Sequence, residues 1–271
     1  MEENRKDLLC EVLASAASQM RGPLGNLHAA LRQLQAQDLP AGGGEERNAA
    51  IAVQSYYRLL RIVGNLSDAP LLSGAAIIRG ADADVVSWLE DLIRQAQPLA
   101  REQGLTLCFH CTEKYHRMSL HRGLMEKLVW NLLSNAMKFT PAGGRIDVSL
   151  EFRGGQALLS VADNGCGISA GQMETVYERY LHPEKIDPPP HGLGLGLPLC
   201  RRIAEGHGGR LMLTSREGEG TTATVSLPDE ESGGAAVEEP MLLDDGGFQR
   251  VLVGLSDALR WGAFTRKHLD E

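Results

Sequence analysis

The feature that most constrains the fold is a long seam of apolar residues near the start of the chain. Between residues 7 and 35 the apolar side chains recur at steps of three or four, at Leu9, Leu13, Ala16, Met20, Leu24, Leu27, Leu31 and Leu34. This near-heptad spacing predicts a long amphipathic helix, in which Pro23 removes one backbone donor and should kink the helix or loosen a turn. The same spacing returns after the loop sequence QDLPAGGGEE, at Ala52, Tyr56, Leu59, Val63 and Leu66.

Two amphipathic helices joined by a short polar loop predict an antiparallel hairpin. Its apolar face is too wide to be buried within the hairpin. Dimerisation into a four-helix bundle would bury that face. Packing of the hairpin on the domain that follows is the alternative.

The remainder of the chain predicts a mixed β-sheet covered by helices on one face, which places the protein in the α+β class. Helices are expected at residues 85–101, 120–138 and 199–205. Strands are expected at residues 105–110, 145–152, 157–163, 210–215 and 221–227. An apolar stretch at residues 248–261 is expected to form a short helix.

Composition limits the classes of protein to consider. The net charge is −8, and residues 229–271 carry −6 of it because ten acidic residues there face four basic ones. A nucleic-acid surface needs clustered Lys and Arg, which the chain does not show. No apolar run approaches the ~20 residues of a membrane span, and residues 1–20 are too charged for a signal peptide. Five irregularly spaced cysteines fit a reducing compartment, so we expect a cytoplasmic protein. Cys108 and Cys111 form a lone C-x-x-C without the second ligand pair of a zinc site.

A first candidate site lies on the predicted helix 120–138. Asn131, Asn135 and Lys138 stand at positions i, i+4 and i+7 and therefore share one helix face. A carboxamide oxygen is a hard, neutral ligand that suits a Mg²⁺ ion already bound to phosphate oxygens. A lysine one turn further can lie against phosphates as a point charge. Taken alone, the same face could be an ordinary solvent-exposed surface.

A second candidate is Asp163, which ends a predicted strand and precedes a turn containing Gly165 and Gly167. A carboxylate there can accept a hydrogen bond from the exocyclic amine of adenine, and the glycines let the backbone approach the base. An Asp-Asn-Gly hairpin turn without any ligand explains the same residues equally well.

The third candidate is a glycine loop in which Gly192, Gly194 and Gly196 alternate with leucines and lead into Pro198 and a helix. Glycine-rich backbone at a helix N-terminus presents free N–H groups to a phosphate. The spacing is not that of a dinucleotide-binding loop, which needs G-x-G-x-x-G within a βαβ unit.

In this order, the three segments NLLSNAMKFTP (131–141), DNGCGI (163–168) and HGLGLGLPL (191–199) resemble the N, G1 and G2 boxes of sensor histidine kinases, within the GHKL ATPase superfamily. YERYL (177–181) resembles the intervening F box. YYRLLRIVGNLSDAPLLSG (56–74) resembles the second dimerisation helix. The resemblance covers about residues 10–228.

The resemblance implies three regions and a set of site residues. A dimerisation hairpin would occupy residues 1–78, an α/β-sandwich ATP-binding domain residues 79–228, and an acidic linker and tail residues 229–271. The implied cofactors are ATP and Mg²⁺. The implied roles are Asn135 as magnesium ligand, Asn131 and Lys138 near the phosphates, Asp163 as the adenine-reading carboxylate, Thr222 as a supporting contact to adenine, and Gly165, Gly167, Gly192, Gly194 and Gly196 as the residues that shape the pocket and its lid.

The chain departs from the family at the phosphoryl acceptor. In such kinases the first dimerisation helix carries His-Glu-Leu-Arg-Thr-Pro-Leu, and the histidine accepts the γ-phosphoryl group. Here residues 18–24 read Ser-Gln-Met-Arg-Gly-Pro-Leu, so Ser18 replaces the acceptor and Gln19 the neighbouring acid. An imidazole with a pKa of ~6.5 is a nucleophile near neutral pH. A serine hydroxyl needs a base, which Gln19 cannot supply.

Three functions are therefore compatible with the sequence. The first is a dimeric signalling kinase of the two-component class that uses Mg-ATP, phosphorylates an acceptor such as a partner's histidine, and works with a response-regulator receiver domain. The second is a pseudokinase, a nucleotide-binding module that signals by conformation or by forming a heterodimer with a competent kinase. The third is a serine kinase related to anti-sigma kinases.

Overall fold

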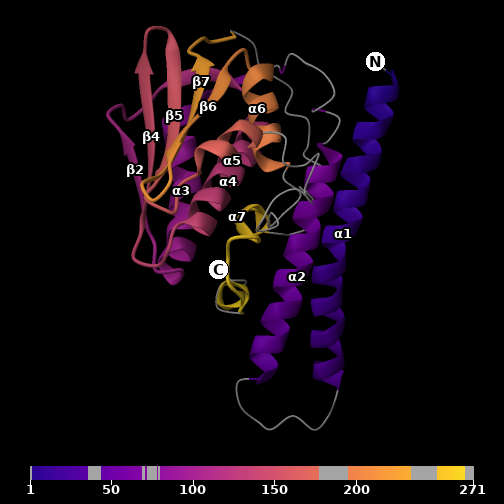
Figure 1. Cartoon of the computed structure of the whole chain (residues 1–271). Helices are drawn as coiled ribbons and strands as arrows, with labels where there is room; N and C mark the ends of the chain where they lie inside the picture. The colour runs from indigo at the N-terminus through magenta and orange to yellow at the C-terminus, as the bar shows by residue number, and fades with distance from the viewer. Residues whose placement is uncertain are drawn as a thin grey trace.

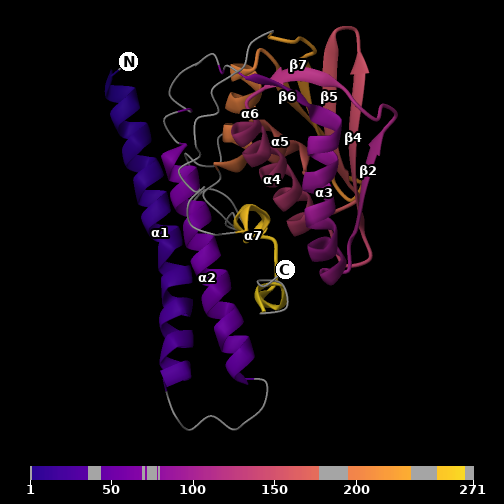
Figure 2. The same cartoon turned by 180° about the vertical axis from the view of Figure 1, so that it is seen from behind.

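The computed structural model describes residues 2–35, 44–68, 71, 78, 80–176, 195–232 and 249–265. These residues form a β-sheet, a layer of helices on one face of the sheet, and a helical hairpin beyond those helices (Figures 1 and 2). Within the described part of the chain, no helix is long and apolar enough to cross a bilayer.

The hairpin consists of α1 (Glu2–Gln35) and α2 (Gly44–Ser67), as the apolar seam predicts. α1 continues through Pro23 without interruption. Small apolar side chains of the seam such as Ala16 and Ala52 are buried. Larger ones remain exposed in the single chain: Leu24, Leu31, Tyr56 and Val63, each with 40–51% of its surface accessible. Dimerisation over these residues stays a prediction.

The main sheet has five strands in the order β2-β4-β5-β7-β6. Their bounds are β2 (Thr106–Cys111), β4 (Arg145–Arg153), β5 (Gln156–Asp163), β6 (Arg210–Arg216) and β7 (Gly220–Pro228). β2 pairs with β4 in parallel and the other pairs are antiparallel, so the sheet is mixed. The α+β class and all five predicted strands are confirmed. A separate pair, β1 (Ala81–Asp84) with β3 (Arg117–Leu120), was not predicted.

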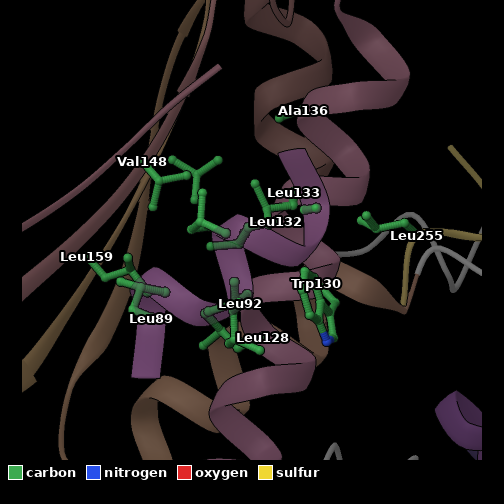
Figure 3. Close-up of a cluster of buried hydrophobic side chains, with 14 of the residues drawn as sticks. Leu89, Leu92, Leu128, Trp130, Leu132, Leu133, Ala136, Val148, Leu159 and Leu255 are labelled. Carbon is green, nitrogen blue, oxygen red and sulfur yellow. The ribbon is translucent and has the colours of Figure 1, made fainter. Parts of the chain in front are cut away.

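Three longer helices lie on one face of the sheet: α3 (Val85–Glu102), α4 (Arg122–Phe139) and α6 (Gly196–Gly206). They match the predicted helices within a few residues, and a short α5 (Ala170–Thr175) was not predicted. α4 occupies the centre of the core: its Leu128 and Leu133 are fully buried together with Val148 and Leu159 of the sheet (Figure 3). The helix that carries the candidate asparagines is therefore held rigidly on its apolar side.

Residues 249–265, which we call the C-terminal segment, contain α7 (Arg250–Leu255) and the 3₁₀ turn η3 (Trp261–Phe264). The segment lies between α4 and α2 (Figures 1 and 2). Its approach to α4 is so close that a Cβ atom on Gly254 would lie 2.6 Å from the Trp130 ring. This part of the acidic tail is thus built into the fold.

A second apolar contact joins the hairpin to the rest of the molecule. Ala16 and Ile62 of the hairpin form a buried cluster with Leu195 and Leu199, which flank the start of α6. Met20 of α1 packs against this cluster. The stretch of α1 that contains Ser18 therefore lies beside the end of the predicted glycine loop.

Candidate functional site

The site is organised around the face of α4 that points towards the hairpin. His121 caps the helix by accepting a hydrogen bond from the Leu124 N–H at 3.3 Å, and the Thr140 hydroxyl donates to the Ala136 carbonyl at 2.6 Å at its other end. Between these caps Asn131 is buried, with 6% of its surface exposed, whereas Asn135 and Lys138 are partly exposed. A helix fixed at both ends presents these side chains at constant spacing.

Asn131 lies where α4 meets both the hairpin and the glycine segment. Its Oδ1 accepts a hydrogen bond from Arg61 Nη2 of α2 at 3.0 Å. On the other side, a Cβ atom placed on Gly196 would lie 3.3 Å from the same oxygen. The structure thus brings Asn131 and Gly196 together, as the sequence motifs require. Gly192 and Gly194 lie outside the described residues, as does the predicted F box at residues 177–181.

The electrostatics around Lys138 are those of a partly buried cation. Its pKa is lowered to about 8, mainly by burial and in addition by the positive charges of Arg61 and Arg58. The carboxylate of Asp257, in the C-terminal segment, acts in the opposite direction and raises this pKa. An ammonium group that is incompletely solvated interacts strongly with an incoming anion.

Asp163 ends β5 and is held in place by main-chain donors. Its Oδ1 accepts the Gly165 N–H at 2.9 Å and the Thr221 N–H at 3.3 Å. Burial nevertheless raises the pKa of this carboxyl, because the two hydrogen bonds lower it by less. Carboxylates whose pKa is raised by burial are found more often at functional sites, where a partly desolvated group can bind a ligand.

The turn after Asp163 packs on the last residues of α4. The Cys166 N–H donates to the Phe139 carbonyl at 3.2 Å. A Cβ atom on Gly165 would lie 2.4 Å from the same carbonyl oxygen, so only glycine allows this approach. Gly167 adopts φ +67°, in the left-handed region. Gly165 is thus needed to join the Asp163 turn to the helix that carries Asn131 and Lys138, and Gly167 to bring the turn against the Arg216 carbonyl, 2.0 Å from its Cβ position.

The register of the sheet corrects the expectation for Thr222. Asp163 of β5 lies directly opposite Thr221 of β7, and Thr222 lies opposite Ala162. Because successive side chains alternate between the two faces of a sheet, Thr222 points to the face away from Asp163. Thr221 is the threonine on the Asp163 side, and its hydroxyl is 2.9 Å from that of Ser215.

Ser18 and Gln19 lie on α1 outside this pocket. Ser18 is exposed and Gln19 is partly exposed. Ser18 is accessible to a phosphoryl donor, but the sequence argument that it has no adjacent base still applies.

Two further groups of polar residues have structural explanations. His207 accepts the His121 N–H at 3.0 Å through Nε2, and its Nδ1 is 2.7 Å from the Ile203 carbonyl, so this ring joins α6 to the start of α4. On the outer face of the sheet, Cys108, His110 and Asp147 lie close together. Arg145 forms two hydrogen bonds with the Asp147 carboxylate, at 2.6 and 2.7 Å, and this pairing already neutralises its charge.

The residue that the sequence did not single out is Arg61. Besides Asn131, it contacts Ser134 at 2.8 Å through Nη1 and lies 3.6 Å from Asp257. The one sequence signal that could have indicated its role is the spacing of Gln54, Arg58 and Arg61, which stand at positions i, i+4 and i+7 and therefore share one face of α2.

Comparison with known proteins agrees with this geometry. Residues 121–231 match the family described as histidine kinase-, DNA gyrase B-, and HSP90-like ATPase. The matched segment contains α4, the Asp163 turn and Gly196. That match covers less than half of the chain, and over most of its length the chain is similar to sensor histidine kinases.

The similarity to individual proteins extends beyond the ATPase domain. The sensor-like histidine kinase SenX3 of Mycolicibacterium smegmatis is 29% identical over 232 residues, which are 84% of this chain and 59% of that protein. The structure of histidine kinase ThkA in complex with response regulator TrrA matches with a TM-score of 0.62 at 19% identity, over 84% of this chain and 64% of that one. Full-length ShkA in complex with AMPPNP matches with a TM-score of 0.59 at 21% identity, over 83% of this chain and 46% of that one. These two structures show a shared fold. The chain spans 59% or less of the first curated relatives that it matches.

Proposed function

We propose that this chain binds Mg-ATP and acts in two-component signalling as a histidine-kinase-type phosphotransferase. The observation that carries the proposal is the convergence of three segments. The half-buried carboxylate of Asp163 is fixed beside the end of α4, and the Asn131 side chain of the same helix lies against Gly196. This arrangement offers an acceptor for an adenine amine at Asp163, and amides and the Lys138 ammonium for phosphates along the neighbouring face of α4.

The donor set fits a magnesium–nucleotide complex. Asn135 is partly exposed on the face of α4 between Asn131 and Lys138, so its amide oxygen can serve as a neutral ligand. Lys138 supplies positive charge close by. When bound, Mg²⁺ would neutralise part of the phosphate charge, while Asp163 orients the base and the glycine segment encloses the phosphates.

In the transfer step, the bond between the terminal phosphorus and its bridging oxygen breaks and a new bond forms to the acceptor, leaving ADP. The acceptor we propose is a histidine of a partner chain, because Ser18 has no neighbouring base. A second copy of this chain carries the same Ser18, so the histidine would come from a heterodimer with a competent kinase. A homodimer or a heterodimer would use the exposed seam residues of the hairpin, such as Leu24 and Leu31. A response-regulator receiver is the proposed downstream partner, by analogy with the ThkA complex. We further propose that the protein acts in the cytoplasm.

A second candidate function is favoured by the residues at the acceptor position. Ser18 and Gln19 replace the histidine and acid of the family, and this is the change expected in a pseudokinase that binds nucleotide and signals by conformation. Transfer to Ser18 itself, as in a serine kinase, would require a base from another chain.

Incubation of the full chain with Mg²⁺ and ATP labelled in the γ-phosphate separates these functions. Acid-labile label indicates transfer to histidine. Acid-stable label that disappears in Ser18→Ala indicates serine transfer. Measurable ATP binding without any label indicates the pseudokinase.

The pocket has a separate test in Asp163→Asn, which we expect to abolish ATP binding in a folded protein. Asp147→Asn is the matched control, because this carboxylate lies on the outer face of the same sheet, paired with Arg145. Retained affinity in Asp163→Asn, or loss of equal size in both variants, would refute the adenine assignment.

A further inference from the structure

The C-terminal segment is packed as tightly as the centre of the molecule. Six of its apolar side chains have at most 8% of their surface exposed: Val251, Leu252, Leu255, Leu259, Ala263 and Phe264. They belong to the same buried cluster as α3, α4 and the sheet, and Tyr57 of α2 joins that cluster. One short stretch therefore connects the hairpin to the ATPase domain.

The hairpin also holds this segment by hydrogen bonds. Three side chains on one face of α2 donate to its main-chain carbonyls: Gln54 Nε2 to Leu259 at 2.7 Å, Arg58 Nε to Ser256 at 3.2 Å, and Arg61 Nη1 to Gly254. The donors rise along α2 while the acceptors fall along the chain, so this part of the segment runs antiparallel to the helix. Carbonyls at the end of α7 have no partner within that helix, and the arginines satisfy them.

Arg61 connects this contact to the nucleotide side of α4. The same guanidinium that donates to Gly254 also donates to Asn131 at 3.0 Å and to Ser134 at 2.8 Å. Its Nε lies 3.6 Å from the Asp257 carboxylate. Only 10% of the Arg61 side chain and 30% of the Asp257 side chain is exposed, so this ion pair is shielded from water.

Asp257 is consequently the internal counter-charge of the cations at this end of the site. It lies beside Arg61, and its charge is felt at Lys138, where the two arginines oppose it. A nucleotide bound as proposed above would bring phosphate charge to the same lysine. A carboxylate and a polyphosphate cannot both use these cations fully, because each neutralises the charge that attracts the other.

We propose that the C-terminal segment is an autoinhibitory clamp whose Asp257 competes with the nucleotide phosphates for Arg61 and Lys138 while the segment holds the ATPase domain against the hairpin. The proposal rests on the function proposed above. Because linkage is reciprocal, clamp closure weakens ATP binding by the same factor by which bound ATP weakens clamp closure. Release of the segment would also free Arg61 and with it the Asn131 side chain. Nucleotide binding would then be coupled to movement of the ATPase domain relative to the hairpin.

The test compares ATP affinity in four forms of the full chain, measured by calorimetry with Mg-ATP. Asp257→Asn keeps the shape of the side chain and removes the competing charge, so we expect it to bind ATP about fivefold to tenfold more tightly than the wild type. Asp91→Asn, which removes an exposed carboxylate paired with Arg94 on α3, is the matched control and should bind like the wild type. Asp163→Asn should not bind.

The outcomes separate the two proposals. Binding by the wild type with equal or weaker affinity in Asp257→Asn overturns the clamp and leaves the ATP pocket standing. No binding in any form overturns the proposed function, and the clamp with it. A second measurement is amide hydrogen exchange of residues 249–265 with and without Mg-ATP. Competition predicts faster exchange when ATP is bound, and unchanged or slower exchange would overturn it.

Discussion

The packing of the C-terminal segment makes a quantitative prediction for Phe264→Ala. Phe264 has 1% of its surface exposed, and its ring centre lies 5.6 Å from that of Tyr57 on α2. Full burial of such a side chain stabilises a protein by about 1.5–3 kcal/mol, and the cavity left by truncation brings the usual cost of Phe→Ala to about 3–5 kcal/mol. The lost aromatic pair with Tyr57 accounts for about 0.5–1.5 kcal/mol. We therefore expect a loss near the middle of that range, about 4 kcal/mol.

We expect this loss to appear first as local opening, because Phe264 lies in the short C-terminal segment and packs on Tyr57 of the hairpin. The appropriate assay is native-state hydrogen exchange of Leu252 and Leu255, compared with Leu128 and Leu133 in α4. A cost of about 4 kcal/mol corresponds to roughly a thousandfold faster opening of the segment, with little change in α4.

Trp261→Ala is the matched control within the same turn. Trp261 is 40% exposed, and its described ring contact is Arg47, whose guanidinium carbon lies 5.7 Å from the ring centre. An exposed cation–π contact contributes about 0.5–1 kcal/mol, so this aromatic truncation should accelerate exchange less than tenfold. If Phe264→Ala accelerates exchange of the segment no more than Trp261→Ala does, burial against Tyr57 does not hold the segment in place.

Three further outcomes are expected. Gly220→Ala should lower the free energy of unfolding, measured with urea, by more than about 2 kcal/mol, because Gly220 has φ +101° and a Cβ there would lie 2.0 Å from the Asp163 carbonyl oxygen. Gly218→Ala is the control: Gly218 has φ +78° with open space around it, so the loss should be only about 1–2 kcal/mol. Burial lowers the pKa of His207, so the contribution of this residue to stability is present above about pH 6.5 and is lost as the pH falls below that value. The unfolding free energy should therefore decrease less between pH 7.5 and pH 5.5 in His207→Gln than in the wild type. An equal decrease in both proteins would contradict this assignment. Burial also raises the pKa of the Cys200 thiol, so iodoacetamide at pH 8 should modify the exposed Cys166 and leave Cys200 unmodified until the protein is denatured, as peptide mass spectrometry would show.

The sequence predicted the sheet and the long helices well because their patterns follow from burial. Ile146, Val148 and Leu150 alternate along β4, and all three are buried in the cluster that also contains apolar residues of α3 and α4. β1 and β3 escaped prediction for the opposite reason. Each is four residues long. β1 has the sequence ADAD with no buried residue, and β3 has only two alternating buried residues, Met118 and Leu120, which is too short a pattern to indicate a strand.

The sequence predicted the individual segments of the candidate site but not the contacts between them. Asp163 was correctly placed at the end of a strand, but the choice between Thr221 and Thr222 depends on register, and a shift of one residue reverses the face. Arg58 and Arg61 have the spacing of an ordinary solvated helix face. Their acceptors are main-chain carbonyls almost 200 residues later, and a main-chain carbonyl leaves no trace in a sequence.

The positions of Ser18 and Arg61 together bear on which function the hairpin serves. Ala16 and Met20, on either side of Ser18, pack on the cluster that includes Leu195 at the end of the glycine segment. Ser18 lies two residues from each, so its side chain projects from roughly the opposite face of α1, where it is exposed. The hairpin therefore holds this stretch of α1 against the ATPase-type domain and leaves the acceptor position accessible. At the same time Arg61, one helix away, joins the hairpin to the nucleotide face of α4. A contact that couples nucleotide state to hairpin position is useful to a kinase that acts on a partner's histidine and equally to a module that signals by conformation. The labelled-ATP experiment decides between them, because only the first requires the terminal phosphoryl group to leave.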